Sequence, residues 1–389
     1  MSVTAPQGFV ASGIHSGIKP SGDPDLSLVA TASGEPVPGA AVFTANKLTA
    51  APVLTSDAHL GATLGSVAAV ILNSGNANAA TGQQGLADAE AMCAAVAAQL
   101  GCRPEEVLVC STGLIGIPMP IDTILAGVPD LVAARWGDGG GDAAEAIRTT
   151  DTHRKETLVR IEGSNAVVGG MAKGAAMLAP NMATMLAVLT TDAAVESHEL
   201  RQVLRLAVST SFNRLMTDAC QSTNDTVIIL ASGAAGPVDP DALATAIGQA
   251  CADLAMQMAG DAEGATKVVK LTVTGAASDA DAELGARQIA RSALCKCSWF
   301  GQDPYWGRLG SEIGSTAAAF DQERFSVSYG GITVAAGGIT VPHDEAAVAA
   351  HMAQPNLVIN CDLGLGSGTF RVITNDLTHE YIDENTGGS

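Results

Sequence analysis

The sequence predicts a mixed α/β fold in which helices and strands recur along the whole chain. A helix is predicted from Asp239 and Pro240 to Met258, because Asp is a favoured N-cap, Pro is a favoured first helical residue, and apolar residues follow at helical spacing. A few residues later, positions 269–273 alternate apolar and polar side chains, the pattern of a half-buried strand. This rapid change of periodicity favours a layered α/β architecture with sheets packed against helices.

The other elements are predicted in chain order from the same two periodicities. An Ala-rich helical spacing covers residues 86–100, and the turn residues Asp261–Gly264 separate the helix and strand described above. The glycine-rich run Trp136–Asp142 is predicted to be a loop. Short apolar runs predict strands at 67–72, 107–110, 185–189, 227–230, 357–361 and 370–373.

The composition is that of a compact enzyme-type chain with a core of small aliphatic residues. Its 389 residues are enough for one large or two medium units with a substantial core. Hydrophobic residues make up 47% and aromatic residues only 3%, so Ala, Val, Leu and Ile must fill most of the core. The 43 glycines allow tight turns and close approach of backbone segments.

The charge and the apolar pattern exclude several kinds of partner. A formal net charge of −20 repels phosphate backbones and anionic lipid surfaces, so neither nucleic acid nor a membrane is expected to bind. No uninterrupted apolar stretch approaches the ~18 residues of a membrane-spanning helix, and the first residues lack the basic start and apolar core of a secretory signal. A cytoplasmic protein is therefore expected.

The cysteines and histidines predict neither a metal centre nor a disulfide scaffold. The eight cysteines show no paired Cys-x-x-Cys spacing, and the seven histidines form no i, i+4 pair. Cys295 and Cys297 have the spacing of one face of a strand, but two ligands alone do not complete a tetrahedral site. We therefore expect no metal and mostly reduced core cysteines.

Thr184 lies where a hydroxyl could become a catalytic nucleophile. Pro180 and Asn181 interrupt regular structure before it and an apolar run from Met185 follows it, so the Ala183–Thr184 peptide lies at a loop-to-strand junction. Attack of the Thr184 Oγ on the Ala183 carbonyl would convert the amide into an ester, and hydrolysis would leave Thr184 as a new N-terminus. The new α-amine, which titrates near ~7.7–8.0, could then accept the hydroxyl proton. The alternative is an ordinary β-branched residue in a core strand.

The segment from Lys173 to Asp192 resembles the self-cleavage site of the ornithine acetyltransferases, also called glutamate N-acetyltransferases, the bifunctional proteins of arginine biosynthesis. In that family a Lys-Gly start leads through Pro-x-Met/Leu-Ala-Thr-Met-Leu to Thr-Thr-Asp-Ala. Further blocks follow the family order over nearly the whole chain: Asn73–Asn78 with Thr81–Gly82, Ser111–Gly116, Thr149–Asp151, Ser222–Thr226, Asp261–Gly264 and Asp303–Arg308.

The resemblance implies a self-processing acyltransferase. Cleavage between Ala183 and Thr184 would give an alpha fragment, 1–183, and a beta fragment, 184–389, which form one intertwined body. The implied fold is a helix–sheet–sheet–helix sandwich of the N-terminal-nucleophile-like type. Acetyl would pass from N2-acetylornithine to Thr184 and then to glutamate without an organic cofactor, and acetyl-CoA stays open as a second acetyl donor. The resemblance also implies a heterotetramer of two alpha and two beta fragments.

The resemblance assigns the residues around the nucleophile as well. Thr112 and Gly113 follow the strand predicted at 107–110 and match the family's oxyanion-hole pair, whose donors stabilise a tetrahedral intermediate. Lys173 would pair with a substrate carboxylate, and Glu263 would pair with the substrate's amino group. The substrate-binding positions of the family match Thr149, Lys173, Thr184, Glu263, Asn385 and, at the C-terminus, Ser389.

The chain departs from the family pattern at a few positions. The tail Asn385–Ser389 is one residue shorter than usual and lacks a Tyr, so Ser389 is the only residue there that could supply the terminal hydroxyl. Tyr305 stands where the family usually has Asn, and Ala80 stands where Cys is frequent. None of these changes removes the nucleophile.

Three other functions stay open from the sequence. An amidase or aminopeptidase with the same nucleophile would pass the acyl group to water instead of an amine. An uncleaved amino-acid-binding paralogue would keep the scaffold without the activity. A nucleotide-binding regulatory protein is suggested by Gly364–Gly368 after an apolar strand, but only 21 residues follow Gly368, too few for the ~30-residue βαβ unit of a dinucleotide site.

Overall fold

The computed structural model describes residues 2–179 and 185–386, and the chain divides into two compact units. The first unit comprises Met1–Asn213 and Cys220–Met258, and the second comprises Arg214–Ala219 and Ala259–Ser389. Each unit builds its own sheets and its own buried core. Two short 3₁₀ helices, η1 (Pro104–Glu106) and η2 (Phe212–Arg214), are also present among the residues described.

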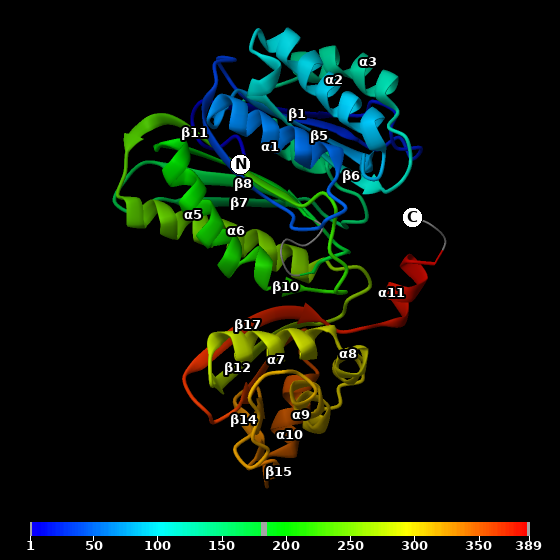
Figure 1. Cartoon of the computed structure of the whole chain (residues 1–389), viewed down its shortest axis with the longest axis vertical. Helices are drawn as coiled ribbons and strands as arrows, with labels where there is room; N and C mark the ends of the chain where they lie inside the picture. Colours follow the sequence, from blue (N-terminus) through cyan, green and yellow to red (C-terminus); the bar gives the residue numbers. More distant parts are fainter. Residues whose placement is uncertain (1, 180–184, 387–389) are drawn as a thin grey trace. The chain divides into compact units, whose positions relative to one another are not determined.

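The first unit contains a four-stranded sheet in the order β1-β2-β5-β6 (Figure 1). The pairs β1–β2 and β2–β5 are antiparallel, whereas β5 and β6 run parallel. Helices α1, α2 and α3 cover its outer face, where Met92 and Ile124 join Leu28 and Ile71 in one buried cluster. The bounds of these elements are Phe9–Ile14 (β1), Leu26–Thr31 (β2), Ala69–Asn76 (β5), Val107–Leu114 (β6), Ala51–Thr63 (α1), Gly82–Leu100 (α2) and Ile121–Ala133 (α3).

A six-stranded sheet in the order β4-β3-β11-β9-β8-β7 forms the second layer of the first unit. Helices α5 and α6 cover its outer face, and the amide of Gln257 on α6 donates to the carbonyl of Glu156 on β7 at 3.0 Å. The bounds are Ser66–Val67 (β4), Val37–Phe43 (β3), Thr226–Pro237 (β11), Leu186–Ala194 (β9), Val167–Lys173 (β8), Lys155–Arg160 (β7), Ser197–Thr210 (α5) and Pro240–Gly260 (α6).

The two sheets of the first unit face each other across a common core. Val29 and Leu72 from the four-stranded sheet and Val188 and Ile228 from the six-stranded sheet belong to one cluster of buried side chains. Their strands are apolar on both faces, as expected for strands covered on one side by helices and on the other by a second sheet. The first unit is therefore a helix–sheet–sheet–helix sandwich, which confirms the predicted fold class.

The six-stranded sheet mixes strands from both sides of the predicted cleavage site. Strands β3, β7 and β8 precede Ala183, whereas β9 and β11 follow Thr184. In space β11 and β9 lie between β3 and β8, with β9 antiparallel to β8 and parallel to β11. The Ala183–Thr184 peptide itself lies outside the described residues, so the fragments 1–183 and 184–389 stay a prediction, and their boundary differs from the boundaries of the compact units.

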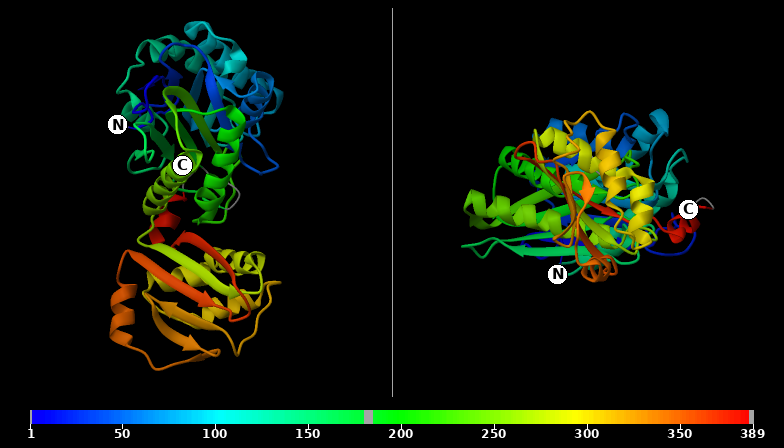
Figure 2. Two further views of the ribbon diagram at one scale, coloured as in Figure 1. Left: turned by 90° about the vertical axis from the view of Figure 1, so that its left-hand side faces the viewer. Right: turned by 90° about the horizontal axis from the view of Figure 1, so that it is seen from below.

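The second unit is built on a seven-stranded sheet in the order β10-β17-β12-β16-β13-β14-β15 (Figure 2). Ala286 and Ile289 of α7 pack on this sheet beside Val273, and the large side chains Trp299 and Tyr329 are fully buried in the same cluster. The bounds are Leu215–Met216 (β10), Gly368–Asn375 (β17), Val268–Ala276 (β12), Asn356–Asp362 (β16), Ser326–Tyr329 (β13), Ile332–Ala336 (β14), Ile339–Thr340 (β15), Asp279–Arg291 (α7), Ala293–Phe300 (α8), Trp306–Gly314 (α9), Glu345–Met352 (α10) and His379–Glu384 (α11).

Three local predictions are wrong or lose their basis. The predicted loop 136–142 ends at Gly139, because Gly140 begins helix α4 (Gly140–Ala146), whose alanines pack into the core between the sheets. Residues 295–297 form part of helix α8 and not a strand, because the Ser292 Oγ accepts the N–H of Cys295 and so caps a helix there. Strand β17 begins at Gly368, so no helix follows the glycine-rich run as a dinucleotide site requires.

Candidate active site

The predicted oxyanion pair lies where strand β6 ends beside β5. Thr112 is buried, with 4% of its surface exposed, whereas the next residue, Gly113, is exposed. Gly113 has φ +135°, and a Cβ there would come within 2.3 Å of the carbonyl carbon of Gly75. Only glycine tolerates both conditions, so the sequence fixes a sharply bent strand end immediately after the Thr112 hydroxyl.

Lys173, the last residue of β8, joins this strand end to the loop after α4. Its side chain is buried, and its Nζ donates to the Thr149 Oγ1 at 2.7 Å and to the Thr112 Oγ1 at 3.2 Å. These three residues are far apart in the sequence, yet their polar groups form one network. The structure therefore brings together three of the residues that the sequence assigned to one site.

Asp151 completes this network, and the sequence assigned it no role. Its carboxylate forms an ion pair with Lys155 at 2.6 Å, lies 3.8 Å from the Lys173 Nζ, and accepts the backbone N–H groups of Gly174 and Thr149. Burial alone would raise the pKa of Asp151, but the two lysine charges and these hydrogen bonds hold it well below its usual range. Asp151 is therefore a buried anion that lies beside both lysine side chains.

Asn224 and Asp225, to which the sequence analysis assigned no role, bond to residues beside two predicted catalytic positions. The Asn224 amide donates to the carbonyl of Ser111 at 3.0 Å, one residue before Thr112. The neighbouring Asp225 carboxyl accepts the N–H of Met185 at 2.9 Å, and Met185 directly follows Thr184 in the chain. The only signal in the sequence was the Ser222–Thr226 block, which carried no assigned role.

Burial dominates the electrostatic environment of Asp225. The residue is fully buried, and burial raises the pKa of its carboxyl well above the usual range, even though the Met185 N–H, Ser222 and the charge of Lys173 act in the opposite direction.

The remaining predicted residues fall into two groups. Ala183, Thr184 and Ser389 lie outside the described residues. Glu263 and Asn385 meet in the second unit, where the Asn385 amide donates to the Glu263 carboxylate at 2.9 Å.

Side chains of both charges line the cavity beside Glu263 in the second unit, with Asp218 and Asp376 on one hand and Arg291 and Lys296 on the other. Partial burial and the neighbouring carboxylates of Glu263, Glu380 and Asp261 raise the pKa of Glu384.

A family model described as the ArgJ family matches residues 10–387. The chain belongs to the ArgJ family. It is 50% identical over 396 residues to the arginine biosynthesis bifunctional protein ArgJ of Mycolicibacterium paratuberculosis, covering 100% of this chain and 96% of that protein. The ArgJ protein of Thermobifida fusca is 46% identical over 390 residues, with both chains fully covered. The predicted family is thus confirmed, and with it the assignment to an enzyme family of arginine biosynthesis.

Two solved structures also resemble this ArgJ-family chain. Ornithine acetyltransferase from Mycobacterium tuberculosis, solved in complex with ornithine, is 48% identical and matches with a TM-score of 0.44 over 46% of this chain and 94% of that chain. The ArgJ protein of Bacillus halodurans is 34% identical and matches with a TM-score of 0.49 over 51% of this chain and 98% of that chain.

Tyr305, which departs from the usual ArgJ-family pattern, lies in the second unit at the start of α9. Its ring is 55% exposed, and the Arg308 guanidinium lies 5.4 Å from the ring centre. This is a surface cation–π contact, worth about 0.5–1 kcal/mol at an exposed site. Tyr305 thus has a local packing role within the second unit.

Across residues 2–179 and 185–386 of this ArgJ-family chain, no three His, Cys, Asp or Glu side chains are grouped as a metal ion requires. Within the same ranges, no helix combines the length and the apolar character needed to span a bilayer.

Replacement of Asp151 by Asn is expected to destabilise the first unit and to flatten its acid denaturation. Loss of the charge leaves buried Lys155 and Lys173 with a weaker acceptor, at a cost of about 1.5–3 kcal/mol. Because the pKa of Asp151 is lowered in the folded state, its stabilising effect is complete above about pH 4 and is lost as the pH falls further. Thermal melts of wild type and Asp151→Asn from pH 3 to pH 8 test this, and identical differences at every pH would contradict it.

Replacement of Asp225 by Ala is expected to slow any chemistry that depends on the strand beginning at Met185. Without the carboxyl, the Met185 N–H loses its acceptor, and a displacement of the order of 1 Å near a nucleophile costs up to about 10²-fold in rate. Asp225→Asn is the matched control, because its amide oxygen can accept the same hydrogen bond without a charge. Self-cleavage rates by intact mass should therefore fall for Ala and stay close to wild type for Asn, and equal rates for the two variants would contradict the assignment.

Proposed function

We propose that this chain is a self-processing acetyltransferase that moves acetyl from N2-acetylornithine to glutamate through Thr184. Membership of the ArgJ family supports the reaction class. The single observation that carries the site is the buried network in which Lys173 donates to both Thr112 and Thr149, because three residues that the family resemblance assigned, far apart in the sequence, meet there.

The first step is cleavage of the chain by its own hydroxyl. The Thr184 Oγ attacks the Ala183 carbonyl, the C–N bond breaks as the C–O ester forms, and the released nitrogen takes up a proton to become the Thr184 amine. Water then hydrolyses the ester, so that Ala183 ends in a carboxylate and Thr184 regains its hydroxyl. Strand β9, which starts two residues later, supports a fixed position for the new N-terminus, since it pairs with strands on both sides.

The acetyl transfer itself follows a ping-pong course. The Thr184 amine accepts the hydroxyl proton as the oxygen attacks the acetyl carbonyl, and the protonated amine then donates a proton to the departing ornithine nitrogen. Glutamate attacks the acetyl ester in the second half-reaction, and the same amine takes up and returns the proton. No organic cofactor takes part.

Thr112 and Gly113 are proposed to hold the oxyanion of both tetrahedral intermediates. The Thr112 Oγ1 accepts a hydrogen bond from Lys173, which leaves its own hydroxyl hydrogen to be donated. A backbone N–H at Gly113 would be the second donor. The Lys173 charge behind the Thr112 oxygen supports this role, because it makes that hydroxyl a stronger donor.

Substrate recognition is proposed to divide between opposite charges. Lys173 and Thr149 of the first unit are proposed to bind the substrate carboxylate. Glu263 and Asn385 belong to the second unit, and their proposed role toward the ornithine ammonium rests on the family resemblance alone. The hydrogen bond from Asn385 to Glu263 supports the view that these two residues act as a pair. Thr184 and Ser389 complete the proposed binding residues, and the mature enzyme is proposed to be a cytoplasmic heterotetramer of two alpha and two beta fragments.

The proposal is tested with purified protein, N2-acetylornithine and labelled glutamate. Labelled N-acetylglutamate formed in equal amount to free ornithine is the expected result. Release of acetate in place of N-acetylglutamate would show that the protein is an amidase. Ornithine binding without either product would show that it is a non-catalytic amino-acid-binding paralogue. A parallel assay with acetyl-CoA as donor decides whether the enzyme is bifunctional.

A further inference from the structure

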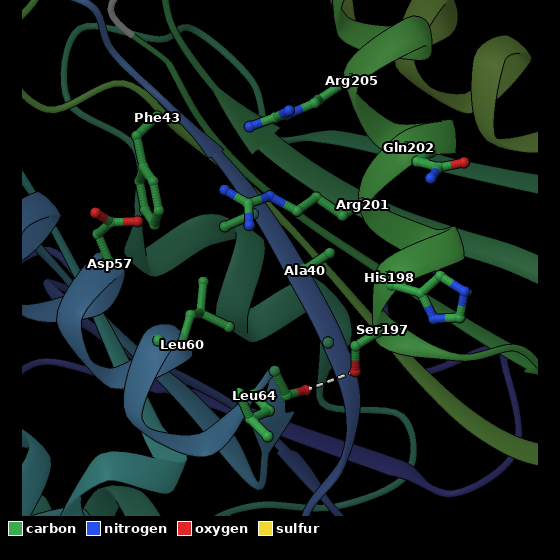
Figure 3. Close-up of a pocket in the computed structure, with 14 residues that line it drawn as sticks. Ala40, Phe43, Asp57, Leu60, Leu64, Ser197, His198, Arg201, Gln202 and Arg205 are labelled. Carbon is green, nitrogen blue, oxygen red and sulfur yellow. Dashed lines mark hydrogen bonds between the residues drawn. The ribbon is translucent and has the colours of Figure 1, made fainter.

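The first unit contains a large cavity formed by β3, the C-terminal half of α1 and the N-terminal half of α5 (Figure 3). Its volume is about 730 Å³, within the range of roughly 300–1,000 Å³ that is usual for small-molecule sites. None of the residues that line it belongs to the network around Lys173 or was predicted as a site residue. A ligand-binding role of this cavity therefore does not depend on the function proposed for Thr184.

The floor and one wall of this cavity are apolar. Gly39, Ala40 and Ala41 of β3 form the floor. The side chain of Ala40 is small, whereas Ala41 on the opposite face of the strand belongs to the core between the sheets. Leu60 and Leu64 stand at the wall formed by α1 (Figure 3).

Leu64 is an unusual residue for the C-terminal cap of α1, because of its backbone conformation and its exposure. It ends α1 with φ +54°, a left-handed conformation that favours glycine at helix ends, and 87% of its surface is exposed. Both its backbone conformation and its exposure carry a cost in the isolated molecule. A ligand that covers Leu64 would recover the cost of the exposure.

The opposite wall is cationic. Arg201 and Arg205 lie four residues apart on α5, and their guanidinium groups extend over β3 into the cavity (Figure 3). Neither forms an ion pair with any residue in the described part of the chain, although acidic residues outnumber basic ones 40 to 20. Like charges at this spacing on a helix repel each other, and a bound anion between them would remove that repulsion.

One carboxylate sets the charge that the cavity can accept. Asp57 of α1 lines the wall facing the arginines, without an ion pair to either of them. Two guanidinium groups and one carboxylate leave one net positive charge. This balance favours a single negative charge on the ligand over the double charge of a phosphate monoester.

We propose that this cavity binds an amphiphilic carboxylate, a small molecule with one carboxylate head and an aliphatic body. The head lies between Arg201 and Arg205, where the planar forks of the guanidinium groups match carboxylate geometry. The body lies along Gly39–Ala41 and covers Leu60 and Leu64. Each CH₂ group removed from water strengthens binding by about threefold to fourfold, so a chain of medium length gains appreciable affinity.

Decanoate is the probe that tests this site, by isothermal titration calorimetry on the full-length protein. One saturable site per chain is expected, with affinity reduced at least about tenfold by Arg201→Gln or Arg205→Gln, because each removes a charge-assisted hydrogen bond. Leu64→Ala is expected to weaken binding by about threefold to tenfold, because it exposes part of the aliphatic body. Arg160→Gln on β7 and Leu206→Ala on α5 are matched controls, since both residues are exposed and neither lines the cavity.

The two halves of the proposed ligand are separated by competition. Acetate carries the head without the body, and decanol carries the body without the head, so neither should displace decanoate at equal concentration. Displacement by acetate would reduce the site to a general anion contact, and displacement by decanol would reduce it to an apolar surface; either result overturns the proposal. Equal losses in the Arg160→Gln control and the cavity variants would overturn it as well, as would the absence of saturable binding. Melting curves show whether each variant is folded.

Discussion

Replacement of Thr184 by Ala should leave one uncut chain with no measurable acetyl transfer. The substitution removes the oxygen that attacks Ala183, and without the cut it also removes the α-amine that serves as base. Loss of a nucleophile that works as a unit with its base lowers kcat by roughly 10⁴–10⁶-fold in comparable enzymes. Intact mass of the purified protein and the labelled-glutamate assay measure the two effects separately.

Thr184→Ser is the matched control for this prediction. It keeps a hydroxyl at the same position and should give two fragments that join at residues 183 and 184, with reduced but measurable transfer. A wild-type chain that stays uncut for days, or an Ala variant that is cut at the same peptide, would remove Thr184 from the mechanism.

Replacement of Thr112 by Val should lower kcat by about 10²–10³-fold and leave KM nearly unchanged. The hydroxyl is proposed to donate to an oxygen that becomes negative only in the transition state, so its loss affects the chemical step far more than substrate binding. Valine has nearly the same shape and keeps the packing at the buried end of β6. Steady-state rates must be expressed per cut chain, with the cut fraction taken from intact mass.

The variant Thr112→Ser distinguishes the effect of the hydroxyl from the effect of the methyl group. Serine keeps both the donor and the acceptor for Lys173, so its kcat should lie within about tenfold of wild type. If Val and Ser variants lost activity equally, the effect would come from the methyl group and its packing. A rise in KM at constant kcat in the Val variant would instead assign Thr112 to ground-state binding.

The sequence predicted the site mainly where residues recur in a family pattern. Thr112, Thr149 and Lys173 were named from the resemblance, and the structure joins them through hydrogen bonds. Asp151 and Asp225 were missed, although both lie in blocks of the same pattern. Their importance comes from complete burial and from partners far away in the sequence, which no local periodicity reports.

The fold could be predicted where one periodicity extends over many residues. The helix expected from Pro240 and the strand expected at 269–273 are present as α6 and β12. The first residues of helix α4, Gly140–Asp142, were included in a predicted loop, because glycines usually mark turns. Here they serve close packing instead: a Cβ at Gly139 would lie 1.9 Å from the carbonyl oxygen of Ala11, and one at Gly140 would lie 2.2 Å from the Ser2 Oγ. Such contacts involve segments far away in the sequence, so the local sequence pattern does not reveal them.

Because β3, β11, β9 and β8 interleave strands from both sides of the predicted cut, this sheet would form more easily before cleavage than after it. A cut after Ala183 would leave every pairing of this sheet in place, from Val168 with Thr191 to Lys173 with Leu186. It would nevertheless change the unfolded state from one chain to two, so that unfolding gains the freedom of a second molecule and its midpoint depends on protein concentration. Refolding would then require an encounter between fragments, whereas the first folding required none. The mature enzyme would be held together by the slowness of its unfolding, as a product that only its uncut precursor can form efficiently.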